Sequence, residues 1–480
     1  MVGLNFAFDN TYRRSLEGFY APWQAATVPA PKLIQLNRAL AAELGLDADA
    51  LPSDAGAAIF AGNVVPLGAE PLAQAYAGHQ FGGFVPQLGD GRALLLGEVI
   101  DRQGRRRDIQ LKGSGRTPFS RGGDGKATLG PVLREYLLGE AMHALGIPTT
   151  RALAAVTTGE PVYRDQILPG AVLTRVAASH IRVGTFQFFA ARGDTAKVRQ
   201  LADYTIARHY PDVATAANPY LAFLDAVVNA QAALIARWML VGFIHGVMNT
   251  DNMAVSGETI DYGPCAFMDR YHPLTVFSSI DGQGRYAYGN QPNIARWNLA
   301  RLAETLLPLI HSDEKAAIAA AANAVNAFTD RYDAYWLDGM RAKLGLLVST
   351  DPEDLALAND FLAALDAAQA DYTLSFRLLS STALGDKAWA ERWHQRLAGA
   401  ESAVSAEERA AAMNRVNPLY IPRNHQVEAA LSAAVDQQNL LPFTTLLEVL
   451  AHPFTESPGL EAYTQPAPGG SGHYRTFCGT

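Results

Sequence analysis

Apolar positions in the first third of this chain fall into short runs that predict β-strands. Two of these runs flank a charged turn at 101–107 and are expected to pair as a β-hairpin. The other runs are bounded by Gly, Pro or polar residues and are expected to complete a small sheet. The predicted strands are 93–100, 108–112, 150–157, 161–164 and 171–177.

Helical spacing of apolar residues begins at 128–145, where Gly146 supplies a stop signal. After the predicted sheet, the pattern is helical almost to the C-terminus, with clear helices at 221–243, after Ser312 and after Pro352. Because strands and helices are segregated along the chain, the sequence predicts an α+β fold.

Changes in sequence pattern divide the chain into four segments. Residues 1–65 mix short helical signals with Pro and Gly and are expected to form an N-terminal extension. The strand-rich segment 66–180 and the helical segment 181–465 are each long enough to bury a core. Residues 466–480 are rich in Pro, Gly and Ser and are expected to form a mobile tail.

The composition is that of a globular protein, with 49% hydrophobic and 18% charged residues, and it excludes disordered and collagen-like chains. The formal net charge of -8 argues against neutralising the phosphates of long nucleic acids, so we expect no nucleic-acid partner. Cys265 and Cys478 form no CxxC pair, and the N-terminus lacks the apolar run of a signal peptide. We therefore expect a cytoplasmic protein.

The most apolar predicted helix, 221–243, contains four polar interruptions and is too polar to span a bilayer. We expect a buried core helix and no membrane partner. The interrupting residues are Asp225, Asn229, Gln231 and Arg237.

A glycine turn, a strand lysine and a helix glutamate form the first candidate site. In the turn 89–92 (GDGR), backbone N–H groups can approach a phosphate and the arginine adds a charged contact, although the same residues suit a tight turn. Lys112 ends a predicted strand, and Glu135 lies on the next helix. In protein kinases, a strand lysine held by a helix carboxylate contacts the phosphates.

Further groups that could contact phosphates follow. The run 113–126 (GSGRTPFSRGGDGK) combines glycines, hydroxyls and cations that could enclose a polyanion, but it has no Walker A frame. A P-loop ATPase is therefore disfavoured. Arg175 and Arg182 offer two more cations after an apolar strand, although a single arginine is more often solvated or ion-paired.

The strongest local signal is HGVMNTDN at 245–252, followed by the sequence DYG that starts at Asp261. Asn252 and Asp261 carry oxygen ligands that suit Mg²⁺. Asp251 could accept a proton from an attacking hydroxyl, although these residue types also form ordinary turns. His245 is expected to be structural.

The order of glycine turn, Lys112, Glu135, HGVMNTDN and DYG is that of a protein kinase. The kinase motif H-R-D places the catalytic base at its third residue, which is Val247 in this chain, so the chain looks like a pseudokinase. Spacing alone supports a metal-assisted nucleotide site and does not decide which phosphorus is attacked.

Several longer sequences closely resemble the selenoprotein O family, also described as YdiU-type proteins: YAGHQFGGFVPQLGDGRA, LKGSGRTPFSRGGDGKA, LREYLLGEAMHALGIPTTRAL and GFIHGVMNTDNM. The resemblance covers essentially the whole chain. It implies a protein-kinase-like fold, with a small β-rich N-lobe, a large helical C-lobe and extensions at both ends. It also implies that ATP binds in a flipped orientation and that AMP is transferred to Ser, Thr or Tyr hydroxyls of proteins, and we expect a monomer.

The resemblance also implies roles for individual residues. Glu135 would pair with Lys112, Asn252 and Asp261 would hold Mg²⁺ or Mn²⁺, and Asp251 would be the general base. The residues that would contact the nucleotide are Gly89, Gly91, Arg92, Lys112, Asp124, Gly125, Arg175, Arg182 and Asp261.

Cys478 lies where eukaryotic members of the family place selenocysteine. With Cys265 it could form a regulatory disulfide that closes the tail toward the active site, and the alternative is two unconnected thiols. Three other functions stay open: a protein uridylyltransferase, a conventional kinase that uses Asp251 as its base, and a nucleotide-binding pseudokinase scaffold.

Overall fold

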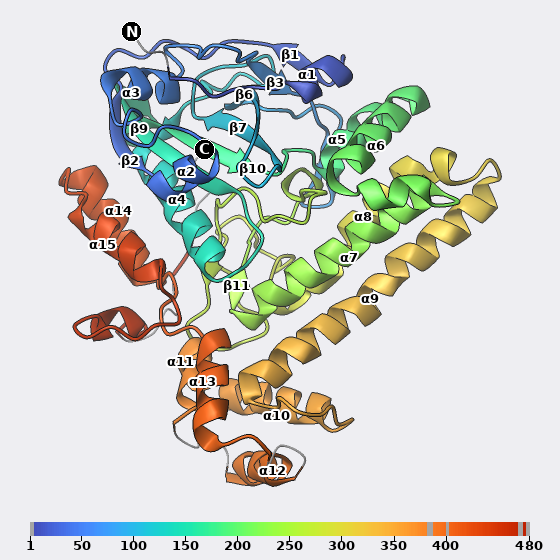
Figure 1. The fold of residues 1–480 in the computed structure, drawn as a ribbon, viewed down its shortest axis with the longest axis vertical. Helices are drawn as coiled ribbons and strands as arrows, with labels where there is room; N and C mark the ends of the chain where they lie inside the picture. Colours follow the sequence, from blue (N-terminus) through green and yellow to red (C-terminus); the bar gives the residue numbers. More distant parts are fainter. Residues whose placement is uncertain (1–3, 382–386, 400–402, 469–473, 477–480) are drawn as a thin grey trace.

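The computed structural model describes residues 4–381, 387–399, 403–468 and 474–476. The strands gather in the N-terminal part of the chain, at the top of Figure 1, and most of the helices lie below and beside them. The structure therefore combines α and β elements in separate parts of the chain, as the sequence predicts.

Eight strands form one antiparallel sheet, and the described residues also contain two separate two-stranded sheets. Its strands are β1 (Tyr20–Pro22), β2 (Lys32–Leu36), β3 (Leu72–Gln74), β6 (Ala93–Ile100), β7 (Arg106–Lys112), β8 (Ala127–Thr128), β9 (Arg151–Tyr163) and β10 (Ile167–Ala177). Their order is β1-β3-β6-β7-β10-β9-β2, with β8 also paired to β10. The predicted hairpin of β6 and β7 is confirmed, and Ala93 faces Lys112 across it.

The sheet differs from the sequence-based expectation at β9. The predicted strands 150–157 and 161–164 form one continuous strand. Gly159 adopts a left-handed conformation with φ +76° inside this strand, and the chain does not turn away there. The pairing register shifts close by, between Pro169 and Ala171 of β10, which is typical of a β-bulge.

Residues of the predicted N-terminal extension contribute to the same sheet. β1 pairs with β3 at one edge, and β2 pairs with β9 at the other. Three short helices accompany these strands: α1 (Thr11–Ser15), α2 (Arg38–Glu43) and α3 (Asp54–Ala61). Helix α4 (Leu129–Ala144) packs against β9 and β10.

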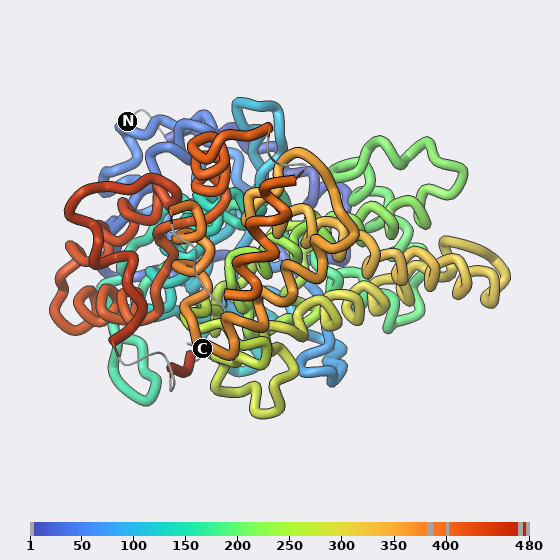
Figure 2. Tube along the Cα trace, turned by 90° about the horizontal axis from the view of Figure 1, so that it is seen from below, coloured from blue at the N-terminus to red at the C-terminus, as the bar shows by residue number. Residues whose placement is uncertain are grey.

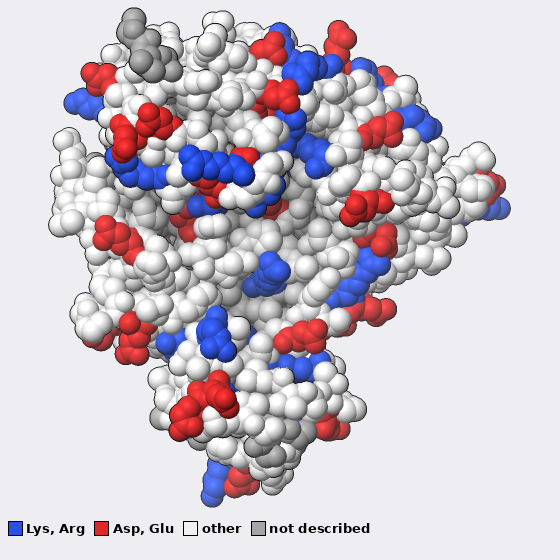
Figure 3. All heavy atoms as spheres, viewed as in Figure 1, with Lys and Arg blue, Asp and Glu red and all other residues white. Residues whose placement is uncertain are grey.

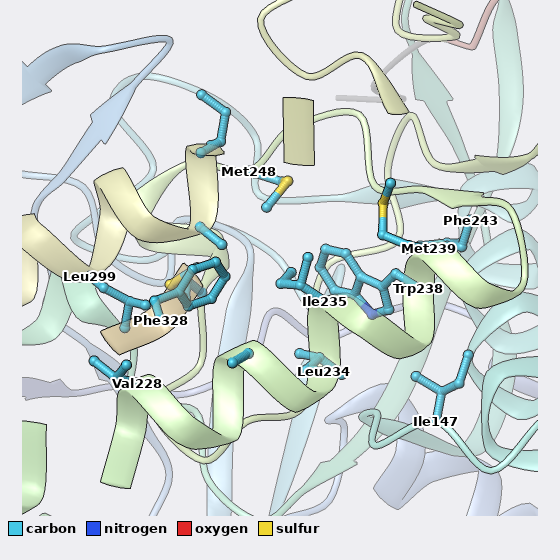
Figure 4. Close-up of a cluster of buried hydrophobic side chains, with 14 of the residues drawn as sticks. Ile147, Val228, Leu234, Ile235, Trp238, Met239, Phe243, Met248, Leu299 and Phe328 are labelled. Atoms are coloured by element: carbon cyan, nitrogen blue, oxygen red, sulfur yellow. The ribbon is translucent and has the colours of Figure 1, made fainter. Parts of the chain in front are cut away.

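Three long helices form the centre of the helical part: α7 (Pro219–Leu240), α8 (Gln291–Ile310) and α9 (Glu314–Leu344). The Asn218 side chain caps α7 by accepting from Leu221 N at 3.1 Å. Figure 4 shows apolar side chains of α7 facing Leu299 of α8 and Phe328 of α9. Full burial of one such side chain contributes about 1.5–3 kcal/mol.

Helix α7 is the one described helix that is long and apolar enough to cross a membrane by length and composition. Half of its most apolar window is buried inside the protein, and it packs against α8 and α9. The buried Gln231 donates to Ala254 O at 2.7 Å, so its polar group is satisfied within the protein. These contacts confirm the predicted core helix.

Four further helices follow α9 in the chain: α10 (Asp354–Ala367), α11 (Tyr372–Leu378), α12 (Lys387–Ala398) and α13 (Ala406–Val416). They are followed by α14 (Asn424–Asp436) and α15 (Leu441–Leu450), which lie together at the left edge of Figures 1 and 2. Both of these helices pack against α4. The chain after α13 therefore returns to the strand-rich part.

The described part of the tail is bound to the rest of the protein. Thr476 pairs with Ser278 in a parallel bridge, and the hydroxyl of Tyr474 donates to Glu428 Oε1 at 2.6 Å. Basic and acidic side chains are interspersed over the face shown in Figure 3.

Candidate functional site

The Lys112–Glu135 pair that the sequence suggests is present in the structure. Lys112 is the last residue of β7, and Glu135 lies on the first half of α4, which packs against β10 beside that strand. The distance from Lys112 Nζ to Glu135 Oε2 is 2.5 Å. Sheet pairing and helix packing together place the ammonium beside the carboxylate.

Asp261 joins this pair from a distant part of the chain. Its Oδ1 accepts from Lys112 Nζ at 3.0 Å and from Arg175 Nη1 at 2.6 Å. Asp261 has a φ of +64°, a left-handed conformation that non-glycine residues rarely adopt. Such strain is typical of functional sites, where the surrounding structure holds a side chain in one place.

Two buried arginines complete an ion-pair cluster. Arg175 Nη1 lies 3.2 Å from Glu135 Oε1, and Arg182 Nη2 lies 3.8 Å from Asp261 Oδ2. Arg182 also lies 3.8 Å from Asp90 Oδ1 and stacks over the ring of Tyr76. The ion-pair cluster therefore contains three cations and three carboxylates, namely Lys112, Arg175, Arg182, Glu135, Asp261 and Asp90.

The charges of the ion-pair cluster determine the ionisation of Asp261. Burial opposes the charged form, but Lys112, Arg175 and Arg182 hold the pKa of Asp261 well below its usual range. For Asp90, burial is the largest effect and raises its pKa. Asp261 is therefore an anion, as a metal ligand or an ion-pair partner has to be.

The glycine turn packs tightly against the run 113–126. Gly89 has a φ of +105°, and a Cβ atom there would lie 2.5 Å from the ring of Phe119. At Gly91, a Cβ atom would lie 2.9 Å from the carbonyl oxygen of Phe119. The hydroxyl of Thr117 donates to Asp90 O at 2.6 Å. The two segments therefore form one folded loop.

Asp124 and Gly125 lie on this loop, outside the ion-pair cluster. Asp124 accepts from Arg164 at 2.8 and 3.0 Å, which lowers its pKa. Gly125 has a φ of +68°, and a Cβ atom there would lie 2.1 Å from Gly115 O. In the described part of the chain, neither residue shows a hydrogen bond or ion pair with Lys112.

A pocket of about 370 Å³ opens beside the ion-pair cluster, between the end of the sheet, α4 and α14. Arg92 of the glycine turn and Lys112 of β7 line it on one side, and Glu428 lines it from α14. Arg475 and Thr476 of the tail form part of its wall. The pocket is large enough for part of a nucleotide, and Arg92, Lys112 and Arg475 are among the cations that line it.

The segment HGVMNTDN follows the end of α7. His245 is fully buried, its Nε2 lies 2.9 Å from Ile260 O, and its Nδ1 accepts from Val247 N at 3.3 Å. Both ring nitrogens are engaged by the backbone, which agrees with the structural role expected for His245. Val247 is buried and offers no proton acceptor in its side chain.

Asp251 and Asn252 lie in the short 3₁₀ turn Thr250–Asn252. Asp251 is buried, its Oδ2 accepts from Gln80 Nε2 at 3.1 Å, and burial raises its pKa to about 6. Asn252 donates from Nδ2 to Val247 O at 3.0 Å, which leaves its side-chain oxygen as the atom available to a ligand.

The donor atoms of Asn252 and Asp261 fit a hard divalent cation. Both present oxygen, the ligand type that Mg²⁺ and Mn²⁺ prefer, and Mg²⁺ commonly takes its remaining ligands from phosphates and water. Among the described residues, no group of three or more His, Cys, Asp or Glu side chains is placed to hold a metal ion. The residues therefore suit a metal that arrives with a nucleotide.

Of the two cysteines, Cys265 is fully buried and Cys478 lies outside the described residues. The nearest described residue of the tail, Thr476, donates its hydroxyl to Pro264 O at 2.7 Å. The described end of the tail is thus bound to the residue that precedes Cys265.

Sequence reasoning missed three polar residues that position the site. Gln110 in β7 accepts from Arg175 Nη2 at 2.6 Å and donates to Asp90 Oδ2 at 3.2 Å. Gln80 contacts Asp251 from a distant segment. A glutamine inside the apolar strand 108–112 was a signal for Gln110, and Asp90 was noted only as part of the turn 89–92, whereas nothing in the local pattern distinguishes Gln80.

The chain is similar to known proteins over nearly its whole length. The family model described as "Protein adenylyltransferase SelO" matches residues 3–451. A protein of Cereibacter sphaeroides named "Protein nucleotidyltransferase YdiU" is 64% identical over 492 residues, which cover 99% of this chain and 100% of the relative. A relative of the same name from Rhizobium leguminosarum is 60% identical over 100% of this chain and 98% of its own length.

The family model covers every candidate site residue except Cys478, and the match to the relative from Cereibacter sphaeroides covers 99% of the chain. They confirm the expectation of a protein nucleotidyltransferase, which uses a nucleotide and acts on proteins. The chain belongs to the SelO family of protein adenylyltransferases.

Proposed function

We propose that this chain transfers AMP from ATP to Ser, Thr or Tyr hydroxyls of proteins, at a metal-dependent site in a protein-kinase-like fold. The observation that carries the proposal is the ion-pair cluster, in which Lys112 of β7 and Glu135 of α4 meet Asp261 of a distant loop. Asp251 lies on the adjoining loop as a buried carboxylate. Membership of the SelO family supports AMP as the transferred group.

The order of these elements supports a kinase-like arrangement. A strand-rich N-lobe at 66–180 would carry the glycine turn and the lysine, and a helical C-lobe at 181–465 would carry the segment HGVMNTDN and Asp261. Residues 1–65 and 466–480 would be extensions, although β1 and β2 also widen the sheet. ATP would bind between the two lobes.

The cations of the ion-pair cluster would bind the phosphates. Lys112, Arg175 and Arg182 now neutralise carboxylates, and a polyphosphate would replace those carboxylates as their partner. Arg92 lines the pocket beside Lys112 and would extend the cationic surface. Gly89, Gly91 and Gly125 would let the loop backbone approach the phosphates closely, with Asp124 fixing the loop through Arg164.

Asn252 and Asp261 would hold Mg²⁺ or Mn²⁺. A divalent ion bound there would neutralise charge on the phosphates during the displacement. When phosphates take over Lys112 and Arg175, the Asp261 carboxylate becomes available to the metal. Exchange of partners within the ion-pair cluster would thus couple nucleotide binding to metal binding.

Asp251 would act as the general base. A base with a pKa near 6 is ionised at neutral pH and still accepts a proton readily. Val247 occupies the position of the base in kinases, so a γ-phosphate transfer of the ordinary kind lacks its proton acceptor. A flipped ATP would instead place its α-phosphorus next to the acceptor hydroxyl whose proton Asp251 accepts.

The name shared by the relatives, protein nucleotidyltransferase, leaves the nucleotide open. UTP is therefore the second candidate donor, because phosphate contacts do not distinguish ATP from UTP. Competition between the two nucleotides for transfer would decide which one the pocket prefers. That the protein is a cytoplasmic monomer without nucleic-acid or membrane partners stays a prediction.

We also propose that Cys265 and Cys478 can form a disulfide that holds the tail beside the site. The hydrogen bond between Thr476 and Pro264 supports this pairing, because each residue lies close in sequence to one of the two cysteines. Peptide mass mapping of oxidised protein tests it. Absence of a Cys265–Cys478 peptide, while activity still responds to a reductant, contradicts it.

Two variants separate the proposed roles of the carboxylates. Asp251→Asn should bind ATP with metal as the unaltered protein does and lose transfer of the AMP label by about 10²–10⁴-fold. Asp261→Asn should lose both metal-dependent ATP binding and transfer. Transfer by Asp251→Asn at the unaltered rate would show that Asp251 is not the base.

A further inference from the structure

A small hairpin contacts the proposed base, Asp251, and packs next to the segment 245–252, called the catalytic loop from here on. Strands β4 (Gly78–Gln80) and β5 (Gly83–Val85) pair with each other through a two-residue turn. The turn residues Phe81 and Gly82 both have positive φ, +51° and +86°, as a type I′ hairpin turn requires. The hairpin therefore has a defined geometry.

Hydrogen bonds fix this hairpin to the catalytic loop on both sides of Gln80. His79 N donates to Thr250 Oγ1 at 2.7 Å, and Phe81 N donates to Asn249 Oδ1 at 3.1 Å. Thr250 in turn donates to Gln187 Oε1 at 2.6 Å. The backbone of Gln80 is thereby held at a fixed distance from Asp251.

The two oxygens of Asp251 differ in their surroundings. Oδ2 accepts from Gln80 Nε2 at 3.1 Å, whereas Oδ1 is buried and has no hydrogen-bond partner among the described residues. A buried acceptor without a partner costs about 1–3 kcal/mol. A hydroxyl group that donates to Oδ1 would remove this cost.

Glycines leave little freedom for the Asp251 side chain. A Cβ atom on Gly78 would lie 2.9 Å from Oδ1, and one on Gly184 would lie 3.4 Å from the Asp251 Cα. Backbone therefore packs closely against Asp251 from two segments. Within this confined space, the hydrogen bond from Gln80 selects the orientation of the carboxylate.

We propose that Gln80 is a positioning residue for the transfer reaction, which holds Asp251 by Oδ2 so that Oδ1 receives the proton of the acceptor hydroxyl. The inference rests on the proposed function, because it concerns the same base. The proton passes from the hydroxyl oxygen to Oδ1 as that oxygen forms its bond to the α-phosphorus and pyrophosphate leaves. Gln80 itself exchanges no proton.

The test uses two variants of Gln80 in the full-length protein. Gln80→Glu keeps the size of the side chain and replaces the amide donor with an acceptor, and Gln80→Met keeps its length without any hydrogen bond. Gln87→Glu, at an exposed position of the same segment, is the matched control for the added charge. The readout is transfer of label from α-³²P-ATP to the protein itself, where kcat is the rate constant of labelling at saturating ATP and KM is the ATP concentration that gives half of that rate.

Both Gln80 variants should lower kcat by about 10–100-fold and leave the KM for ATP within about twofold, because a misplaced base slows the reaction without disturbing the nucleotide. Gln87→Glu should behave as the unaltered protein. In an Asp251→Asn background, Gln80→Met should cause no further loss, since its effect passes through Asp251. If Gln80→Glu does not fold, Gln80→Met alone decides.

Unchanged kcat in Gln80→Met, with transfer abolished in Asp251→Asn, would overturn the role of Gln80 and leave the base in place. An equal loss from Gln80→Met with and without Asp251 would also overturn it, because Gln80 would then act on another group. Full transfer by Asp251→Asn would instead remove the proposed base, and the role of Gln80 with it.

Discussion

Lys112 Nζ donates to Asp261 Oδ1 across 3.0 Å, although the two residues lie 149 positions apart in the chain. The same ammonium contacts Glu135. A proposed phosphate ligand and a proposed metal ligand therefore neutralise each other in the structure. Binding of a nucleotide with its metal would separate them and give each its own partner.

Replacing Glu135 tests how Lys112 is held. Glu135→Gln removes the charge that orients Lys112 and Arg175, so we expect transfer of AMP to fall by at least about tenfold, equivalent to about 1.4 kcal/mol. Steady-state kinetics with labelled ATP measure the change. Glu304→Gln is the control, since Glu304 pairs with Arg301 at the surface, where an ion pair contributes little. Equal rates for the two variants would argue against the role of Glu135.

Two glycines in the left-handed conformation offer a matched test of the glycine turn 89–92. Gly89→Ala would force a Cβ atom against Phe119, whereas Gly104→Ala, at a φ of +77°, would meet no atom within 4 Å. Both should lose about 1 kcal/mol of folding stability from backbone strain. We expect Gly89→Ala alone to weaken ATP binding, measured by calorimetry, because it displaces the loop. Equal affinities in the two variants would contradict a phosphate role for the turn.

The burial of Lys343 should make the folding stability depend on pH. Its side chain is buried over the rings of Phe376 and Tyr372, and burial lowers its pKa to about 7. As pH falls from about 10 toward 7, the unfolded chain binds a proton that the folded chain does not, so stability declines in this range. Below pH 7 the folded chain also binds the proton, and the loss levels off.

Lys343→Met should therefore stabilise the protein by about 1–4 kcal/mol near pH 7. The gain should shrink as pH rises from 7 toward about 11, because above the ordinary pKa of 10.5 the lysine is neutral in the unfolded state as well. Denaturant unfolding followed across this range measures the difference. A gain that stays constant with pH would mean that titration of Lys343 does not contribute.

Local sequence patterns predicted the elements that carry the site. The apolar runs of β6 and β7 and the periodicity of α4 placed Lys112 and Glu135 on neighbouring elements, because short-range pattern determines secondary structure. The merging of two predicted strands into β9 was missed, because Gly159 can either turn a chain or continue it through a bulge.

Long-range contacts were beyond the local pattern. The sequence placed Arg175, Arg182 and Asp261 as separate candidates, and only the fold shows that they share one ion-pair cluster. Gln80 contacts Asp251 because a separate hairpin packs on the catalytic loop. Such a contact depends on tertiary packing, which no periodicity in either segment encodes.

The most direct test of the account is to supply ATP labelled on the α-phosphate or on the γ-phosphate, with Mg²⁺ or Mn²⁺, and to identify the group attached to protein. The account predicts label from the α-phosphate alone and an adduct with the mass of AMP, lost in Asp251→Asn. Label from the γ-phosphate alone would contradict it and identify a kinase that uses a different base position.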